Sequence, residues 1–531
     1  MIDLANVSPL LLPWVEDAWG VMRPPVSVEA AQLSAELAET TYHMDVDGWL
    51  RAGWQDATIQ MDGELTPVRP REGWLAKQIR HHRVQSRLHQ QGMREQLLGT
   101  LRQVEQSDTG KALVMMHAAP EGRYVVAVGF MGTGAQFYDW ISNFRMTSQE
   151  GVHRGFLQLT RQFEENEERI EFPETARELG LRRLTLGQVL REMQHPHSRF
   201  VLWLAGHSQG GALMQVYAHR KIHENRVLPR NIVGYGFASP SVMLGKAVEQ
   251  PAAYPLYHIQ NSDDVVPRCG AEMHLGVCLV YPADEILRRR CYPWPMDEKS
   301  LRARACVAPI LRQMTDTAAC IESAVAFLNV ISTVPSADML DVLGLSGNFP
   351  LRRMVAAADV NELVCSARRH AAMAYQSITG RPLDQARVAD FMADIEAAVE
   401  AVGLQSFGVA LRQMMSVPHS MSARLTGGCV GAYMYIVNGG MERLIPVCWQ
   451  AGSPPTRLLG VRRTAQVRVG ESSGECTLNN RRRQAVPRRV HRNLRYRDPR
   501  PRTDTRHHTP ELERGAIRDG EKLLRTKERR K

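Results

Sequence analysis

The chain has 531 residues, of which 44% are hydrophobic and 23% are charged, a composition typical of a soluble globular protein. Its formal net charge of +10 arises at the C-terminal end, because residues 481–531 hold 19 Lys and Arg against 7 Asp and Glu and the first 480 residues are nearly neutral. No apolar stretch is long enough to span a bilayer, since the best candidate, 324–334, is interrupted by Asn329 and Ser332. These features exclude a helical membrane-spanning protein and a fold that is basic throughout.

In chain order, the sequence predicts helices first and then an alternation of strands and helices. Residues 28–42 are good helix formers, and residues 77–105 form a second predicted helix that is basic and rich in glutamine. Two strands, 112–117 and 124–130, are joined by a hairpin turn at 119–122. The elements that follow are helices near 153–170, 185–194 and 209–222, and strands at 199–205, 232–238, 256–260 and 276–281. This alternation predicts an α/β sheet that is covered on both faces.

The predicted elements divide the chain into four parts. An N-terminal helical region covers 1–109, and an α/β core covers 110–285. Alanine, methionine and leucine at helical spacing then predict a helical insertion over 286–455 rather than a separate enzyme. The hydrophobic periodicity is lost after about residue 455, so we expect residues 456–531 to be a disordered, Arg-rich basic tail.

Cysteine usage and the N-terminus bear on the compartment. The nine cysteines all follow residue 268, their number is odd, and no Cys-x-x-Cys pair occurs, which favours buried free thiols in a reducing compartment. The N-terminus has no basic segment, and Leu10-Leu11-Leu12 is too short for a signal peptide, so we expect a cytoplasmic protein or one exported by another route. No cluster of residues has the spacing of a metal site, and neither a metal nor an organic cofactor is expected.

One segment indicates a catalytic serine. An apolar run at 200–205 leads directly into Gly206-His207-Ser208-Gln209-Gly210, and a helix-compatible stretch follows at 211–218. A Gly-x-Ser-x-Gly turn between a strand and a helix is the nucleophile elbow of α/β-hydrolases, in which the glycines remove Cβ atoms that would collide at a strained turn. The segment therefore favours Ser208 as a nucleophile, and the alternative is a glycine-rich turn in another α/β protein.

A serine nucleophile also needs a base and an acid that orients the base. In α/β-hydrolases these residues follow in the order Ser, Asp or Glu, then His. The strand at 256–260 runs into Asp263 and Asp264, at the carboxyl end of a predicted sheet strand, where catalytic groups gather in open α/β folds. Both aspartates qualify by position, and a turn or cap role stays open for either.

Four segments, in this order, resemble the class 3 lipase family, which comprises the fungal-type triacylglycerol lipases and their bacterial and plant relatives. They are FMGT at 130–133, followed by Asp139-Trp140; VHRGF at 152–156; GHSQGGA at 206–212; and YGFASP at 235–240, followed by NSDDVVP at 261–267. The resemblance covers about residues 110–285 and implies an α/β-hydrolase fold with Asp264 as the catalytic acid. Two positions depart from the family, because Met131 stands where arginine is usual and Gln209 stands where leucine is usual.

The resemblance also implies an oxyanion hole and a catalytic histidine. Thr133 would supply a backbone N–H and a hydroxyl, and the N–H of Gln209 would be the second donor. His370 resembles the family's His-x-x-x-x-Tyr segment and is the first choice for the base, although a helical insertion must then separate it from the acid. His419 is the alternative choice for the base. Three further histidines are expected to be structural: His153, His207 and His274.

Two features bear on access to lipid. Phe137, Trp140, Ile141 and Phe144 fall on one helical face, where lipases of this family carry a lid helix, and the plain alternative is a buried helix face. The basic tail is a solvated end, an electrostatic anchor for anionic lipid, or a nonspecific nucleic-acid binder. Specific nucleic-acid binding is not expected, because Tyr496 is the one Phe, Trp or Tyr residue of the tail on which a base could stack.

The sequence therefore predicts a serine carboxylic-ester hydrolase, similar to a lipase or phospholipase, that acts on lipid esters. It would use Ser208, Asp264 and His370 and form an acyl-enzyme. One alternative is a catalytically silent hydrolase fold that binds lipid or serves as a scaffold, and another is a short-chain esterase or thioesterase. The lid and the tail are the candidates for peripheral membrane contact, and the oligomeric state stays open.

Overall fold

The computed structural model describes residues 2–17, 20–57, 112–132, 148–149, 151–244, 247–292, 294–333, 357–422 and 430–447. All of them lie in one unit, Met1–Gly474, and the second unit, Glu475–Lys531, lies outside the described residues. Three predicted features also lie outside the described residues: the helix at 77–105, the apolar stripe from Phe137 to Phe144, and the tail at 456–531.

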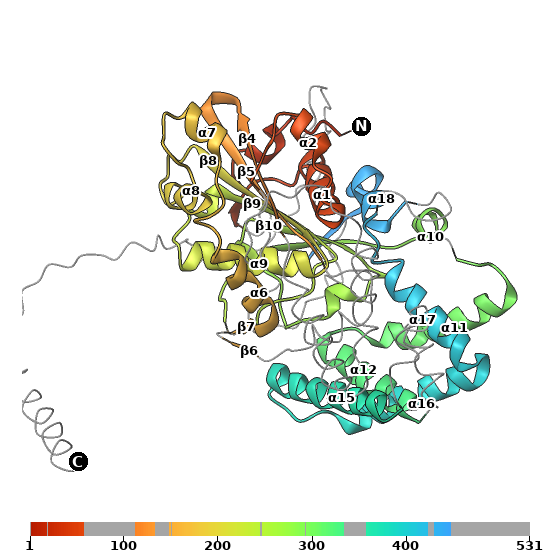
Figure 1. Ribbon diagram of the computed structural model, residues 1–531. Helices are drawn as coiled ribbons and strands as arrows, with labels where there is room; N and C mark the ends of the chain where they lie inside the picture. Colours follow the sequence, from red (N-terminus) through yellow and green to blue (C-terminus); the bar gives the residue numbers. More distant parts are fainter. Residues whose placement is uncertain are drawn as a thin grey trace, which may run out of the picture. The chain divides into compact units, whose positions relative to one another are not determined.

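The core of the described structure is an eight-stranded sheet (Figure 1). Its strand order is β12-β11-β10-β9-β8-β5-β4-β3, in which β5, β8, β9, β10 and β11 run parallel. The pairs β3–β4, β4–β5 and β11–β12 are antiparallel. The strands are β3 Gln55–Asp56, β4 Ala112–Ala119, β5 Arg123–Phe130, β8 Phe200–His207, β9 Ile232–Phe237, β10 Leu256–Asn261, β11 Val277–Tyr281 and β12 Ile445–Val447. The sheet is mixed and mostly parallel, and the predicted α/β architecture is confirmed.

Successive side chains of the central strands point to opposite faces of the sheet, and both faces are buried. In β8, Val201 and Trp203 belong to one hydrophobic core, whereas Leu202 and Leu204 belong to the other. Two pairs of helices contribute to these cores: α1 (Val28–His43) and α18 (Ala432–Gly439) to the first, α6 (Arg154–Glu164) and α9 (Gln209–His223) to the second. Burial of a large aliphatic side chain stabilises a fold by about 1.5–3 kcal/mol. Burial on both faces thus makes β8 a firm base for the turn that follows it.

Helix α1 lies close to the sheet and ends beside the predicted nucleophile. It begins after Ser27, whose hydroxyl oxygen accepts a hydrogen bond from the N–H of Ala30 (3.1 Å). A Cβ atom at Gly129 of β5 would come within 2.9 Å of the Thr41 side chain, so the glycine allows the helix to approach the strand. This approach brings Tyr42, in the last turn of α1, to the end of β8, where its hydroxyl contacts His207.

The helices that were predicted after residue 296 pack on one another in the segment between β11 and β12 (Figure 1). They are α11 Glu298–Gln313, α12 Thr317–Ser332, α15 Ala357–Thr379, α16 Gln385–Val402 and α17 Leu404–Ser416. They have a hydrophobic core of their own, in which Ile321, Phe391 and Phe407 are fully buried, and we call these five helices the helical layer. After α17 the chain returns to the sheet through Pro418 and His419 and continues into α18 and β12.

The remaining elements are short. The helices are α2 Asp47–Arg51, α7 Pro173–Glu178, α8 Leu186–Glu192 and α10 Glu285–Cys291, and the strands are β1 Val15–Glu16, β2 Met22–Arg23, β6 Ser148–Gln149 and β7 Val152–His153. The described residues also form 3-10 turns at Ser8–Leu11, Pro120–Gly122, Pro229–Asn231, Pro251–Ala253, Val266–Arg268 and Met441–Arg443.

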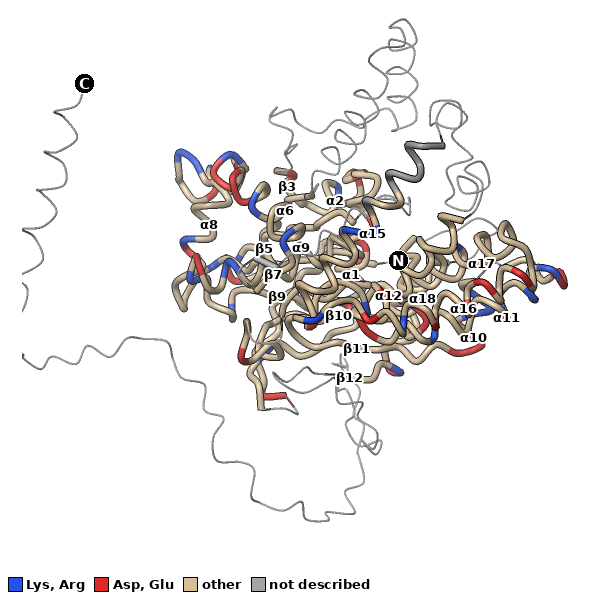
Figure 2. The backbone as a smooth tube through the Cα atoms, turned by 90° about the horizontal axis from the view of Figure 1, so that it is seen from below, with Lys and Arg blue, Asp and Glu red and all other residues tan. Residues whose placement is uncertain are grey.

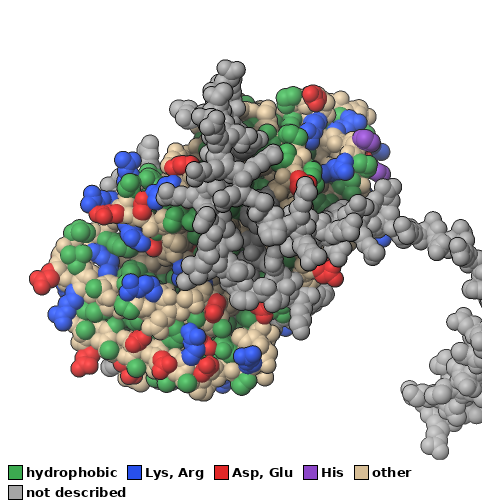
Figure 3. All heavy atoms as spheres, turned by 180° about the vertical axis from the view of Figure 1, so that it is seen from behind, with side chains coloured by type: hydrophobic (Ala, Val, Ile, Leu, Met, Phe, Trp, Pro, Cys, Tyr) green, Lys and Arg blue, Asp and Glu red, His purple; other side chains and the backbone are tan. Residues whose placement is uncertain are grey.

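The surface of the described residues is mixed in character. Basic and acidic residues are interspersed along the described backbone (Figure 2), and hydrophobic side chains are scattered among charged ones on the face shown in Figure 3. Among the described helices, none combines the length and the apolar character that crossing a membrane requires.

Candidate active site

Ser208 stands at the turn between β8 and α9, in the backbone geometry of a nucleophile elbow. Its φ of 57° and ψ of −128° are unusual for a residue with a side chain. The Ser208 N–H donates a hydrogen bond to the carbonyl oxygen of Phe237 in β9 (2.9 Å), which fixes the turn to the sheet. A Cβ atom at Gly206 would lie 2.3 Å from the Gly210 backbone, so the turn requires glycine at this position.

The end of β5 packs closely against the elbow. A Cβ atom at Gly210 would lie 2.0 Å from the carbonyl oxygen of Phe130, and one at Gly132 would lie 2.6 Å from the carbonyl oxygen of His207. The segment that resembles the family's oxyanion segment therefore runs beside Ser208. Of the two predicted oxyanion donors, Gln209 is buried and is the first residue of α9, whereas Thr133 lies outside the described residues.

Asp264 lies just beyond the carboxyl end of β10 and is 1% exposed. Its Oδ1 accepts a hydrogen bond from the Val266 N–H (2.9 Å). Its Oδ2 accepts one from the Tyr433 hydroxyl (2.7 Å) and one from Nδ1 of His419 (2.9 Å). The other predicted candidate, Asp263, instead pairs with Arg288 of α10 at 2.9 Å. The structure thus separates the two aspartates by environment and places Asp264 against an imidazole.

His419 has the position of a base that is oriented by a carboxylate. A carboxylate oxygen can only accept a hydrogen bond, so Nδ1 carries the proton in this contact and Nε2 of the neutral ring keeps a lone pair. The side chain is 13% exposed, whereas Asp264 is fully buried. An imidazole held in this way has the tautomer that a general base needs for a serine hydroxyl.

The structure does not bring His370, the first choice from the sequence, to Asp264. His370 lies on α15, within the helical layer, and its side chain is exposed. The motif that selected it, His370 followed by Tyr375, falls on one regular helix, where the Tyr375 hydroxyl donates to Glu322 of α12 (2.8 Å). Among the described residues, the imidazole that contacts the Asp264 carboxylate is that of His419, which follows the end of α17 at Ser416.

Two of the three histidines that were expected to be structural have backbone partners that explain them. Nδ1 of His153 accepts a hydrogen bond from the Phe156 N–H (3.4 Å) and caps α6. Nε2 of His274 lies 2.7 Å from the carbonyl oxygen of Ser239, and burial lowers the pKa of His274 to about 4. The predicted structural roles of these histidines are in line with these contacts.

His207 has a more specific position, between α1 and the loop that carries His419. Its Nε2 lies 2.8 Å from the carbonyl oxygen of His419, and its Nδ1 lies 2.6 Å from the Tyr42 hydroxyl. Because the carbonyl can only accept, Nε2 donates and Nδ1 accepts from Tyr42. Burial, followed by the nearby His419, holds the pKa of His207 well below its ordinary value, so the ring stays neutral. The hydrogen bonds from Tyr42 to His207 and from His207 to the carbonyl oxygen of His419 therefore fix the backbone of the candidate base.

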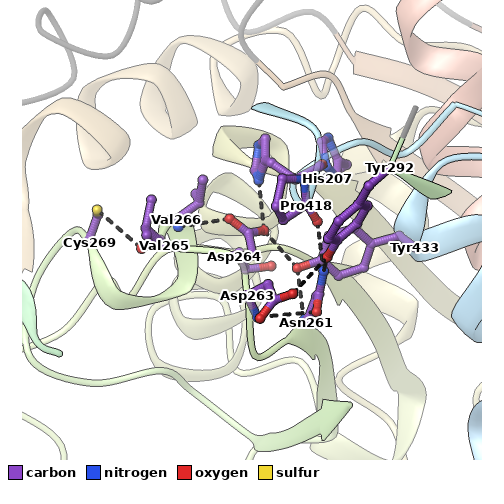
Figure 4. A network of polar contacts seen from close by, with 12 residues as sticks. His207, Asn261, Asp263, Asp264, Val265, Val266, Cys269, Tyr292, Pro418 and Tyr433 are labelled. Carbon is purple, nitrogen blue, oxygen red and sulfur yellow. Dashed lines mark hydrogen bonds and ion pairs between the residues drawn. The ribbon is translucent and has the colours of Figure 1, made fainter. Parts of the chain in front are cut away.

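A second set of hydrogen bonds fixes the same loop from the sheet side (Figure 4). The side-chain amide of Asn261 donates to the carbonyl oxygen of Pro418 (3.1 Å) and to the Tyr292 hydroxyl (2.8 Å). The Asn261 backbone N–H donates to the Tyr433 hydroxyl (3.1 Å), which in turn donates to Asp264. Neither Tyr42 nor Tyr433 was singled out from the sequence, because each comes from an element that lies far from the motifs along the chain.

In the part of the chain that the structure describes, no group of three or more His, Cys, Asp and Glu residues could hold a metal ion. Ser208 follows β8, Asp264 follows β10 and His419 follows α17, so the hydroxyl, the carboxylate and the imidazole each come from a different part of the fold. The mixed sheet, its two layers of helices and the strained serine turn define an α/β-hydrolase.

Residues 127–273 match the family model for lipase (class 3), which confirms the resemblance over this segment. The matched segment contains Ser208 and Asp264 but ends before His370 and His419. A comparison with curated proteins finds no match.

Similar solved structures are lipases. A triacylglycerol lipase whose catalytic centre is described as a serine-protease triad has 19% identity, and the alignment covers 33% of this chain and 63% of that lipase (TM-score 0.24). The Rhizomucor miehei lipase in complex with its propeptide has 14% identity, with 50% and 76% covered (TM-score 0.30). The lipase of Rhizopus microsporus var. chinensis has 17% identity, with 52% and 85% covered (TM-score 0.29).

Proposed function

We propose that this protein is a serine carboxylic-ester hydrolase that acts on lipid esters, with Ser208 as nucleophile, His419 as base and Asp264 as the orienting acid. The observation that carries the proposal is the 2.9 Å contact between Nδ1 of His419 and the buried carboxylate of Asp264, which lies at the end of the same sheet as the strained Ser208 turn. His419 takes the place of His370 in this proposal, because His370 lies on the helical layer.

The proposed reaction begins with proton transfer from Ser208 to the Nε2 lone pair of His419 as the serine oxygen attacks the acyl carbonyl. Asp264 holds the ring through Nδ1 and stabilises the imidazolium that forms. The imidazolium then gives its proton to the leaving alcohol, and an acyl-enzyme remains. Water, activated by the same imidazole, releases the acid and restores Ser208.

The oxyanion that forms at the acyl carbonyl needs fixed donors. We assign this role to the backbone N–H of Gln209 and to Thr133, following the resemblance to the lipase family and the position of Gln209 directly after the nucleophile. Loss of one such donor costs about 3–4 kcal/mol of transition-state stabilisation. The close packing of Phe130 and Gly132 against the elbow supports the assignment for the segment that leads to Thr133.

The groups around the proposed triad make the loop that carries His419 rigid. Tyr42 and His207 hold the backbone of His419 from α1, and Asn261 holds Pro418 from β10. A base whose backbone is held from two sides loses little freedom when the transition state forms, which is how preorganised sites lower a barrier. The substrate class, a lipid or other acyl ester, rests on the family match, and membrane contact through the segment 137–144 or the tail is part of the same proposal.

Hydrolysis of p-nitrophenyl esters that range from acetate to palmitate tests the proposal. We expect turnover by the full chain, with a preference for long acyl groups, and a loss of about 10⁶-fold in kcat for Ser208→Ala. Preference for acetate would indicate a short-chain esterase or thioesterase instead. No turnover by folded protein, with detergent present, would indicate a silent hydrolase fold that binds lipid or serves as a scaffold.

A further inference from the structure

Two buried cysteines, Cys269 and Cys320, meet where the loop of the catalytic acid contacts the helical layer. Cys269 lies five residues after Asp264, and its thiol donates a hydrogen bond to the carbonyl oxygen of Val265 (3.4 Å) (Figure 4). Cys320 lies in the first turns of α12. Both thiols are free and buried, and both belong to the hydrophobic core of the helical layer.

The N-terminal end of α12 is fixed against the segment that contains Cys269. The Thr317 hydroxyl lies 3.0 Å from the carbonyl oxygen of Arg268 and 2.7 Å from that of Ala271, the residues on either side of Cys269 and Gly270. Cys320 is three residues after Thr317 and therefore lies on the same face of α12, one turn along. The helix thus presents Cys320 to Cys269.

Cys320 also affects the ionisation of the Cys269 thiol. A hydrogen bond to Cys320, followed by burial, raises the pKa of Cys269 well above its ordinary value. Few thiolates form at neutral pH in such a place, which keeps the pair reduced in the absence of an oxidant. The backbone of Cys269 is also held in place, because its carbonyl oxygen accepts hydrogen bonds from the Ser241 N–H (3.0 Å) and hydroxyl (2.9 Å).

We propose that Cys269 and Cys320 are a redox modification site, at which a small disulfide such as oxidised glutathione converts the two thiols into an intramolecular disulfide. The Cys269 thiolate attacks one sulfur of the small disulfide, which forms a mixed disulfide and releases one small thiol. Cys320 then attacks the Cys269 sulfur, and the second small thiol leaves. Two electrons pass from the protein to the small disulfide, and the two cysteine protons end on the two small thiols or in water.

The disulfide ties the loop of Asp264 to α12 by a covalent bond. Its sulfur atoms stand about 2.05 Å apart, and the Thr317 contacts already hold the start of α12 against the segment that contains Cys269. The consequence for hydrolysis rests on the proposed function, since Asp264 is the acid of the proposed triad. Formation of the bond does not rest on it, and the variant Ser208→Ala should form the bond as readily as the wild type.

Peptide mapping tests the proposal on the full chain. The protein is incubated with oxidised glutathione at pH 7 and at pH 8.5, blocked with N-ethylmaleimide in denaturant, and digested with trypsin without reductant. The expected product is peptide 269–288 linked to peptide 313–352, formed faster at pH 8.5 and lost after addition of dithiothreitol. Peptide 269–288 also contains Cys278, so Cys278→Ser is the matched control and should retain the link.

Cys269→Ser and Cys320→Ser should each abolish the link. Glutathione on Cys365, which is exposed on α15, reports that the oxidant has acted. Full modification of Cys365 with no linked peptide in the wild type would overturn the proposal, as would a link that persists in Cys269→Ser. Where a serine variant does not fold, fragment ions of the wild-type linked peptide that assign the bond to Cys278 in place of Cys269 would overturn it equally.

Discussion

Replacement of Tyr433 by phenylalanine removes one oxygen atom from the centre of the proposed triad. The hydroxyl donates to Oδ2 of Asp264 (2.7 Å) and accepts the backbone N–H of Asn261 (3.1 Å). Tyr433 itself is fully buried on α18, so water cannot take over either contact without a rearrangement of the core. The ring of phenylalanine fills the same space, which limits the change to the two hydrogen bonds.

The magnitude follows from these two contacts. A hydrogen bond to a charged group contributes about 1.5–3 kcal/mol, and a buried N–H left without an acceptor costs about 1–3 kcal/mol. Since the two effects share one oxygen atom and partial relaxation follows, we expect the free energy of unfolding to fall by about 2–4 kcal/mol. Asp264 keeps its contacts with Val266 and His419, so kcat/KM should fall by roughly 10- to 100-fold rather than the roughly 10⁴-fold of a lost acid.

Urea unfolding and the hydrolysis of p-nitrophenyl esters measure the two effects. Tyr435→Phe is the matched control, because Tyr435 is partly buried on the same helix two residues away, and it should leave both quantities nearly unchanged. A Tyr433→Phe protein with the stability and kcat/KM of the control would refute the idea that the Tyr433 hydroxyl supports Asp264.

Three further predictions follow from the site and its surroundings. Gly206→Ala should lower the free energy of unfolding by about 3 kcal/mol and abolish hydrolysis, because the added Cβ would lie 2.3 Å from backbone atoms. The control is Gly439→Ala, where the space around the added Cβ is open. In the same urea titration it should change the free energy of unfolding by less than about 0.5 kcal/mol. Tyr42→Phe should reduce kcat/KM by about 3- to 10-fold, since it removes one neutral hydrogen bond to His207; an unchanged value in steady-state kinetics would contradict the positioning role of Tyr42. Burial lowers the pKa of His219 to about 4, so between pH 6.5 and pH 4 the unfolded chain binds a proton that the folded chain does not, and stability falls as the pH falls, by up to about 3 kcal/mol. His219→Gln should make the free energy of unfolding depend less on pH between pH 6.5 and pH 4. An equally steep decrease in the variant would show that burial of His219 does not cause it.

The parts of the site that are local in sequence could be predicted from it. The strand, the glycine spacing and the helix that follows identify Ser208 as an elbow residue, and the structure gives it the strained backbone that the motif implies. Asp264 also follows a strand directly, and its choice over Asp263 came from the resemblance to the lipase family. Both predictions depend on contacts within one or two neighbouring elements.

The histidine could not be predicted in this way, because the helical layer separates it from the acid. Within 298–416, helical periodicity describes how the helices pack on one another and carries no information on where the chain returns to the sheet. His370 matched a short motif by sequence alone, on a helix where that motif has a different partner. One signal was present, since Pro418 and His419 stand where a long helical segment ends.

The supporting tyrosines were missed for a related reason. Tyr42 reaches the site because small residues let α1 pack close to β5 and β8, and Tyr433 reaches it because α18 covers the same face of the sheet. Such contacts join segments that are more than 160 residues apart. A single sequence shows the composition of each helix but not the side chain that faces the nucleophile.

The rate at which a fluorophosphonate probe labels Ser208 tests the central claim, that His419 is the base, most directly. We predict that His419→Ala labels at least about 10³-fold more slowly than wild type, that His370→Ala labels within twofold of wild type, and that Ser208→Ala does not label. Labelling of folded His419→Ala at the wild-type rate, or loss of labelling in folded His370→Ala, would contradict the account.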